Sequence, residues 1–361
     1  MDQKTDLGVR RNRIAAVLKS SASQAFVITA LPNIRYLSGF TGSNAALLLT
    51  TDRALLFTDP RYQTQAPQES DCEVKIAKGS LSTEVAKWLK RLRVKTIGFE
   101  QNRIGFEEYT HLKDSADRSA RLKPLAGVVE SLRMVKSSAE IATIRASVQL
   151  NSAALEQAFR HFRRTMTEVD FAAEIEYRMR RLGADGTAFQ TIVASGARSA
   201  LPHAHPTDRP IQGNQLLLVD MGAAVAGYAS DMTRTHSVGK LDARTRRMYR
   251  AVLESQLAAI DAVKPGVSCA TVDRTARQVL SGYGLDKLFT HSTGHGLGLE
   301  IHEMPRVGRK ESTKLQAGMV ITIEPGVYKE GIGGIRIEDT VVVTDRGYDV
   351  LTPTGKELIV L

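Results

Sequence analysis

Cysteine and long hydrophobic runs are scarce in this sequence of 361 residues. Only Cys72 and Cys269 occur, without a CxxC partner, which argues against a disulfide framework and against a thiolate zinc site. No apolar run reaches the roughly 20 residues needed to cross a bilayer. The opening MDQKTDLGVRRNR also lacks the apolar segment of a secretory signal. We therefore expect a protein of the reducing cytoplasm with no membrane partner.

Positive charge is in excess, with a formal net charge of +10. The basic stretches 87–95, 160–164 and 178–181 could indicate a nucleic-acid partner. Apolar residues are interleaved in them at helical spacing, which is typical of the solvated faces of amphipathic helices. No known recognition module accompanies the charge, so we expect no nucleic acid among the partners.

The chain is long enough for two domains. In the first third, the runs 25–29, 45–50 and 54–58 read as strands, and helical patterns follow at about 82–93 and 106–114. These elements predict a smaller α/β domain at residues 1–128. The boundary falls just after Pro124 and Gly127.

The remainder, residues 129–361, is predicted to be an α+β domain with an antiparallel sheet. Ser137 followed by Glu140 predicts a capping box at the start of a long helix. No repeat of 20 to 50 residues is evident. The expected helices lie at about 138–162, 168–182, 243–263 and 270–282, and the expected strands at 215–222, 227–238, 319–328 and 334–344.

Two aspartates interrupt apolar strands in the segment 216–235. Asp220 ends the run LLLVD, and Asp231 lies in a second strand after the turn-prone AAVAG. A hairpin would place them on facing strands, where two buried carboxylates are costly unless a positive group neutralises them. The structural alternative is that one caps a turn and the other pairs with Arg234.

Two glutamates repeat the pattern. Glu324 follows MVITI, and Glu338 stands in GIRIED, so each acid again interrupts an apolar stretch in which an unpaired charge would be expensive. Four such acids together with a histidine cluster predict a site for divalent metal. Bridging carboxylates that hold two ions fit this acid-rich set better than one ion does.

The histidines concentrate in THSTGHGLGLEIHEMP, residues 290–305. His291 and His295 are four positions apart, but Gly294 and Gly296 argue against a helix, so the segment is predicted to be extended. The glycines would let the backbone pass close to an ion. One metal ligand and two other imidazoles are expected here, and spacing alone does not assign them.

These motifs resemble those of the pita-bread dinuclear metallopeptidases, which include aminopeptidase P, prolidase and methionine aminopeptidase. The matching stretches are DMGAAVAGYASDMTRT (220–235), STGHGLGLEIHE (292–303), ITIEPGVY (321–328) and GIRIED (334–339). YLSGFTGSNA (36–45) and TDPRYQTQA (58–66) resemble the N-terminal domain of creatinase and aminopeptidase P. The resemblance implies a pita-bread catalytic domain preceded by a creatinase-type domain. Creatinases lack the metal ligands, and the intact set argues against that function.

The resemblance also implies a ligand set for two divalent ions, with Mn the common choice and Co or Zn possible. His295 and Glu324 would bind one ion and Asp220 the other, while Asp231 and Glu338 would bridge them. The ions would lower the pKa of a shared water, and Glu324 would act as general base.

Further roles follow from the same resemblance. His203, in SGARSALPHAHP, and His302 would donate hydrogen bonds to the scissile carbonyl and the leaving proline nitrogen. His291 would line the proline-side pocket. Arg336, Tyr328 and Asp220 would form a relay that orients a ligand carboxylate. His205 is expected to lie at the surface or behind the residues that contact the substrate.

The implied activity is hydrolysis of the bond between an N-terminal residue and a following proline. The N-terminal motifs favour aminopeptidase P, acting on proline-containing peptides, as the main expectation. Arg306, four residues after His302, favours the alternative, an Xaa-Pro dipeptidase in which an arginine binds the free carboxylate of the dipeptide. A non-catalytic binding protein of the same fold is a more distant alternative. Relatives are often dimers, so a homodimer is expected.

Overall fold

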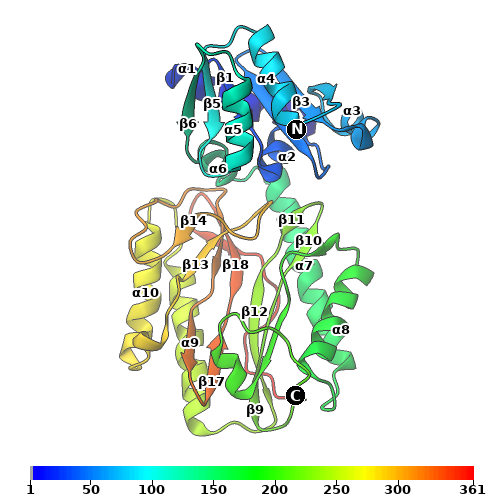
Figure 1. Cartoon of the computed structure of the whole chain (residues 1–361). Coiled ribbons are helices and arrows are strands. Elements are labelled where there is room, and N and C mark those ends of the chain that lie inside the picture. The colour runs from blue at the N-terminus through cyan, green and yellow to red at the C-terminus, as the bar shows by residue number, and fades with distance from the viewer. Residues whose placement is uncertain (1–2) are drawn as a thin grey trace. The chain divides into compact units, whose positions relative to one another are not determined.

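The computed structural model describes residues 3–361, and the chain divides into two compact units, Met1–Arg133 and Met134–Leu361 (Figure 1). The first unit is built on one mixed sheet of six strands in the order β4-β3-β2-β1-β5-β6. The strands are β1 (Ala25–Ile28), β2 (Ala45–Thr50), β3 (Ala54–Thr58), β4 (Glu73–Ile76), β5 (Thr96–Glu100) and β6 (Arg121–Leu125). The helices are α1 (Gln3–Ser20), α2 (Leu31–Ser38), α3 (Gln65–Glu69), α4 (Leu81–Arg91), α5 (Phe106–Ser115) and α6 (Val128–Arg133), with a 3-10 turn η1 at Pro60–Tyr62.

The three predicted strands and two predicted helices of this unit are present, and others were missed. Two of the missed strands, β4 and β6, are the edges of the sheet. Their sequences, EVKI and RLKPL, carry charges and a proline because an edge strand is only partly buried. They therefore lack the continuous apolar pattern that marks β1, β2 and β3.

The second unit places strands between two pairs of helices. Figure 1 shows α9 and α10 along one side of the strands and α7 and α8 along the other. The helices are α7 (Ser138–His161), α8 (Glu168–Arg181), α9 (Ala243–Asp261) and α10 (Cys269–Gly282), with 3-10 turns η2 (Gly196–Ala200) and η3 (Asp286–Leu288). All four predicted helices are confirmed, as is the capping box, in which Ser137 accepts from the N–H of Glu140 and Glu140 from that of Ser137.

The strands of the second unit form several antiparallel groups: β12-β9-β8, β14-β13-β15-β18-β19, β11-β10-β7 and β16-β17. Their bounds are β7 (Gly186–Thr187), β8 (Ile192–Ser195), β9 (Gln215–Met221), β10 (Ala223–Val225), β11 (Tyr228–Ala229), β12 (Met232–Val238), β13 (Gly294–Gly296), β14 (Glu303–Val307), β15 (Val320–Ile323), β16 (Gly326–Lys329), β17 (Gly333–Arg336), β18 (Asp339–Val343) and β19 (Tyr348–Val350). The N–H of Glu338 donates to the carbonyl of Thr233 at 3.1 Å. This bond joins the segment between β17 and β18 to β12, so the group that contains β18 and the group that contains β12 meet at the acidic residues.

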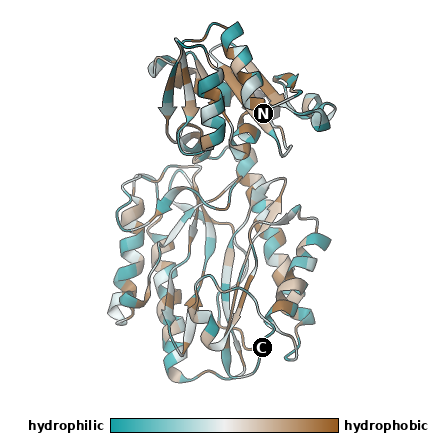
Figure 2. Cartoon of the chain, in the orientation of Figure 1, coloured by the Kyte–Doolittle hydropathy of each residue, from teal (hydrophilic) through white to brown (hydrophobic). Residues whose placement is uncertain are grey.

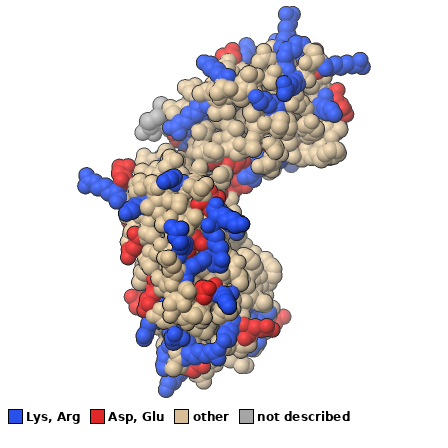
Figure 3. Space-filling model, turned by 90° about the vertical axis from the view of Figure 1, so that its left-hand side faces the viewer, with Lys and Arg blue, Asp and Glu red and all other residues tan. Residues whose placement is uncertain are grey.

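The basic stretch 178–181 lies at the end of α8, whereas 87–95 and 160–164 begin in α4 and α7 and continue past the ends of these helices. Figure 2 shows hydrophilic and hydrophobic residues side by side along single helices. In α4, Val85 and Leu89 are buried. Two cations lie over the ring of Trp88: Nζ of Lys75, from β4, is 4.4 Å from the ring centroid, and Cζ of Arg91 is 4.7 Å from it. On the face drawn in Figure 3, Lys and Arg are interspersed with Asp, Glu and uncharged residues. Among residues 3–361, none of the helices combines the length and the apolar character that a bilayer span needs.

His236, on β12, lies in the core of the second unit with 2 % of its surface exposed. Its ring packs edge-on against Phe159, with centroids 4.5 Å apart. Neither ring nitrogen has a hydrogen-bond partner among the described residues. Burial, with a smaller contribution from Arg234, lowers the pKa of His236 to about 3. The ring is therefore neutral in the folded protein at any pH well above 3.

We expect His236 to make the second unit less stable at acid pH. Its pKa is lower in the folded chain than in the unfolded one, so its contribution to stability is complete above about pH 6.5 and is lost as the pH falls toward about 3. Near pH 5 the loss is about 2 kcal/mol. In urea unfolding, the wild type should lose about 2 kcal/mol more than His236→Leu between pH 7.5 and pH 5, because the two proteins share every other titrating group. The surface variant His111→Gln should show the same change in unfolding free energy between the two pH values as the wild type. The same change in all three proteins would contradict this role of His236.

Candidate metal centre and active site

Asp220 and Asp231 come from paired strands, β9 and β12. Asp220 stands opposite Thr233 in the register of this pair, and Asp231 directly precedes β12. Both residues are buried, at 9 % and 5 % exposure. Arg234 pairs with Asp339 at 2.8 Å rather than with Asp231. The alternative in which one of the two aspartates pairs with Arg234 is therefore wrong.

Glu324 and Glu338 flank a single strand pairing. Ile323 of β15 stands opposite Asp339 of β18, so Glu324, next after Ile323, and Glu338, next before Asp339, emerge at the same end of the pair. Glu338 is 1 % exposed. The chain leaves regular pairing at these two positions, which frees both carboxylates to face the aspartates.

His295 is the middle residue of the short strand β13, so the extended conformation predicted for it is confirmed. The glycines beside it serve a different purpose from the one expected. A Cβ at Gly294 would lie 1.9 Å from the carbonyl oxygen of Thr322, and one at Gly296 would lie 2.2 Å from that of Met304. These glycines let β13 approach the backbones of β15 and β14, and the prediction that they make room for an ion is corrected accordingly.

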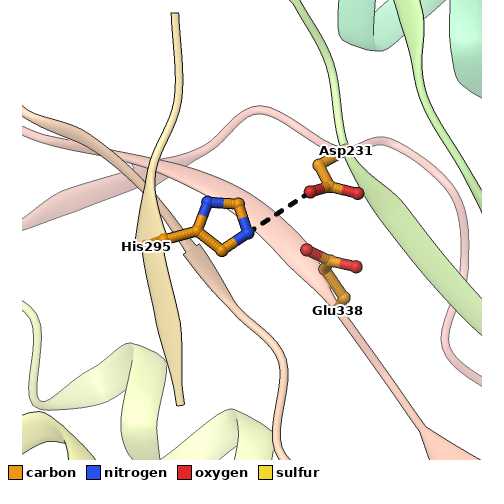
Figure 4. A group of neighbouring side chains, drawn as sticks. All are labelled: Asp231, His295 and Glu338. Carbon is orange, nitrogen blue, oxygen red and sulfur yellow. Dashed lines mark ion pairs between the residues drawn. The ribbon is translucent and has the colours of Figure 1, made fainter. Parts of the chain in front are cut away.

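Three of the predicted ligands form one group, and Glu324 lies beside His295. Figure 4 shows Asp231, His295 and Glu338 pointing toward one another, and their ligand atoms all lie within 4.8 Å of each other. The Nε2 atom of His295 is 3.5 Å from Oδ2 of Asp231 and 3.5 Å from Oε1 of Glu324. Asp220 reaches the group through its charge, which acts on the pKa of Asp231, Glu324 and Glu338.

The electrostatics of this cluster call for a cation. Burial, followed by the charges of the neighbouring carboxylates, raises the pKa of Asp231 and of Glu338 well above the usual range. Burial likewise raises the pKa of Glu324 to about 7. One oxygen of Asp220 and one of Glu338 are buried without a hydrogen-bond partner among residues 3–361. Unpartnered carboxylate oxygens beside an imidazole form a donor set suited to divalent metal.

A hydrogen-bonded chain leads away from Asp220. Arg336 donates from Nη2 to Oδ2 of Asp220 at 2.6 Å and from Nη1 to the hydroxyl of Tyr328 at 2.7 Å. The Tyr328 hydroxyl also lies 2.8 Å from Nε2 of His291. Burial, followed by the charge of Arg336, lowers the pKa of His291 to about 4, so this imidazole is neutral at physiological pH. This series of hydrogen bonds holds the Asp220 carboxylate in place and links it to His291.

His302 packs edge-on against the ring of His295, with centroids 4.5 Å apart. It is exposed to solvent overall, yet its neighbours remove part of its water. This desolvation, followed by the charges of His295 and His203, lowers the pKa of His302. His203 and His205 are exposed residues of the loop after η2. Arg306, also exposed, stands directly opposite His295 in the β13–β14 register.

Sequence reasoning missed two threonines that hold the carboxylates. Thr233 donates from Oγ1 to Glu338 at 2.7 Å and accepts from Nε of Arg336 at 2.9 Å. Thr322 accepts from the N–H of His295 at 3.1 Å and donates to Glu324 at 3.4 Å. Both are polar residues inside buried strands, MTRTHSV and VITI, and that contrast was the available signal.

The comparisons with known proteins agree with this geometry. Residues 142–345 match Metallopeptidase family M24, and residues 10–135 match the Creatinase/Prolidase N-terminal domain. An Xaa-Pro dipeptidase of Pyrococcus horikoshii is 37 % identical over 350 residues, which cover 96 % of this chain and 97 % of the relative.

Solved structures are similar along the whole chain. An Xaa-Pro dipeptidase from Bacillus anthracis aligns with a TM-score of 0.95 and 36 % identity, covering 98 % of this chain and 100 % of that one. An X-Pro aminopeptidase from Thermotoga maritima aligns with a TM-score of 0.90 and 35 % identity, again covering 98 % and 100 %. The expected two-part architecture is confirmed. The curated relatives favour the dipeptidase alternative over the main expectation of aminopeptidase P.

Proposed function

The chain belongs to metallopeptidase family M24, and we propose that it is an Xaa-Pro dipeptidase. The buried cluster of four carboxylates and His295 carries the peptidase part of the proposal, because its unpartnered oxygens need a divalent cation. The names of the curated relatives support the dipeptide substrate.

We propose two divalent ions, with Mn²⁺ the first choice to test, held by Asp220, Asp231, His295, Glu324 and Glu338. When bound, such ions supply Lewis acidity and lower the pKa of a water molecule toward neutrality. The carboxylates that are costly to ionise in the metal-free chain become stabilised as anions in this role. Arg336 holds Asp220 in a fixed orientation, and Thr233 does the same for Glu338.

The chain's own residues supply the remaining chemistry. Glu324, beside His295 at 3.5 Å, accepts a proton as general base. His302, a neutral imidazole beside His295, donates a hydrogen bond to the oxygen of the scissile carbonyl, and His203 acts with it on the substrate. His291 and Tyr328 form the wall against which the proline ring is held. The conformationally restricted tertiary amide before proline would then fit this site, whereas ordinary peptide bonds would not.

Arg306 supports a dipeptide over a longer substrate. Residues directly opposite in an antiparallel pair place their side chains on the same face, with Cβ atoms about 5 Å apart. Arg306 therefore projects on the face of β14 that His295 occupies on β13. A guanidinium there can bind the free carboxylate that follows proline in a dipeptide, by a charge-assisted hydrogen bond.

Cleavage rates of the Mn²⁺-loaded enzyme on Xaa-Pro and Xaa-Pro-Yaa peptides test the proposal. We expect the dipeptide to be preferred, and we expect Arg306→Ala to lower kcat/KM for the dipeptide by about 10- to 100-fold, since a hydrogen bond to a charged group contributes about 1.5–3 kcal/mol. The same substitution should leave the tripeptide rate within about threefold. Arg309→Ala, which removes another exposed arginine just after β14, is the control. A tripeptide preference untouched by Arg306→Ala would favour the aminopeptidase.

A further inference from the structure

The loop at residues 195–207 carries His203 and has little regular structure after η2. For His203 to act on the substrate, this surface loop has to hold its side chain near the cluster of carboxylates and His295. Burial has the largest effect on the pKa values of His291, His302 and Glu324, and the charge of His203 acts on all three. His203 is therefore within electrostatic reach of the site, although its own side chain is exposed.

Glu168 closes this loop at its base. It is the first residue of α8 and is completely buried, with 0 % exposure. Its Oε1 accepts from the N–H and the hydroxyl of Ser195, both at 2.8 Å. Its Oε2 accepts from the N–H of Thr207 at 3.1 Å, from the hydroxyl of Thr207 at 2.9 Å and from Nε of Arg198 at 3.1 Å. Each carboxylate oxygen thus holds one end of the loop.

The middle of the loop is attached to the site itself. Nη1 of Arg336 donates to the carbonyl of Pro202, the residue before His203, at 3.3 Å. The hydroxyl of Ser199 accepts from the N–H of Gly334 on β17 at 2.8 Å. Nη2 of Arg198 donates to the carbonyl of His205 at 2.6 Å. His203 is therefore placed between a base that Glu168 holds and a contact with the guanidinium that orients Asp220.

A buried carboxylate is expensive unless its charge and both of its oxygens are satisfied. Glu168 meets this requirement with five hydrogen bonds, the positive charge of Arg198 and the N-terminal end of α8. Arg198 and Thr207 lie in the loop, and Ser195 is the last residue of β8, where the loop begins. Glu168 thus ties the far end of the loop to the end of a sheet strand, which fixes the loop rather than contributing to packing in general.

We propose that Glu168 is a positioning residue for catalysis, which holds both ends of the 195–207 loop so that His203 meets the substrate. This inference rests on the proposed function in one respect, the contact of His203 with the scissile peptide. Glutamine at position 168 would keep one acceptor, but its amide N–H groups would face donors from Thr207 and Arg198. The loop would then open at one end, and His203 would lose its place.

The test is a double-mutant cycle in the metal-loaded enzyme. Glu168→Gln should lower kcat by about 10- to 100-fold, as loss of an orienting partner does elsewhere. In a His203→Ala background the same change should cost less than about twofold, since the group that it positions is already gone. Glu176→Gln, an exposed glutamate on the same helix, is the matched control and should leave kcat unchanged. An equal loss in both backgrounds would overturn the proposal.

Hydrogen exchange supplies a readout that needs no substrate. Peptides from 196–207 should exchange faster in Glu168→Gln than in Glu176→Gln, with metal content unchanged in both. Unchanged protection of the loop would overturn the proposal for Glu168. If the wild-type protein cuts no Xaa-Pro peptide, the proposed function is overturned, but the exchange result still tests whether Glu168 holds the loop. If Glu168→Gln does not fold, Thr207→Val removes one bond to Glu168. It should give about a threefold loss of kcat that disappears in the His203→Ala background.

Discussion

Asp231→Asn is expected to abolish metal binding and to lower kcat for an Xaa-Pro peptide by at least about a thousandfold. Asp231 faces both His295 and Glu338, so its loss removes a ligand from the centre of the cluster. A divalent ion supplies several kcal/mol of charge stabilisation in the transition state, and about 4 kcal/mol corresponds to a thousandfold rate change. The measurement is kcat together with metal content after reconstitution.

The same substitution should have the opposite effect on the metal-free protein. Burial and the charges of Glu338 and Asp220 raise the pKa of Asp231, so an ionised carboxylate at this position destabilises the metal-free fold. Asparagine removes that charge, and the metal-free Tm should rise. Wild-type protein should gain about 2.7 kcal/mol when the free metal concentration is 100 times its Kd, and the variant should gain nothing.

The control is Asp345→Asn, which makes the same chemical change at an exposed position between β18 and β19. It should leave kcat, metal content and Tm as in the wild type. A variant at position 231 that kept its metal and its activity would remove Asp231 from the ligand set. A metal-free Tm that fell with the activity would instead indicate that Asp231 stabilises the fold through contacts other than metal.

The sequence was most informative where a charge interrupts a buried strand. Asp220 and Glu324 stand out because each comes after a largely apolar strand run, and a charge in that position needs a partner. The helices were found for a related reason, since their apolar faces repeat over several turns and the capping box marks the start of α7. These signals are local, and they can be seen without knowing the fold.

Hydrogen-bond partners distant in the chain could not be found in this way. Thr233 and Glu338 are separated by 105 positions, and only the fold brings them to 2.7 Å. Glu168 was placed within the predicted helix at 168–182 without any role, because an acid at the first turn of a helix is ordinary. Its five hydrogen bonds, from Ser195, Arg198 and Thr207, become visible only once β8 and the following loop have been packed against α8.

The proposed preference for dipeptides shows the same limit. Arg306 was noted from its distance along the chain to His302, whereas in the fold it stands opposite His295, across a strand pair. A four-residue spacing says nothing about which face a side chain occupies until the register of the strands is known. The β13–β14 register is thus what makes Arg306 a stronger candidate for the substrate carboxylate.

His302→Ala should lower kcat by about 100- to 1000-fold, the typical cost of removing one oxyanion donor, while the metal content stays at the wild-type level. The pKa of His302 is lowered by desolvation and by its neighbours His295 and His203, so the ring is a neutral hydrogen-bond donor near pH 7. His302→Gln, which keeps an N–H donor, should recover part of the loss. His205→Ala, an exposed histidine of the His203 loop, is the control and should leave kcat within about twofold.

Two results would contradict this role. If the metal content fell together with kcat, His302 would act by packing against the ring of His295, which lies 4.5 Å away, rather than on the substrate. If kcat stayed within about threefold of the wild-type value, the ring would make no hydrogen bond that strengthens in the transition state. An unchanged KM with a reduced kcat is the pattern that a transition-state donor requires, because such a bond contributes little to binding of the ground state.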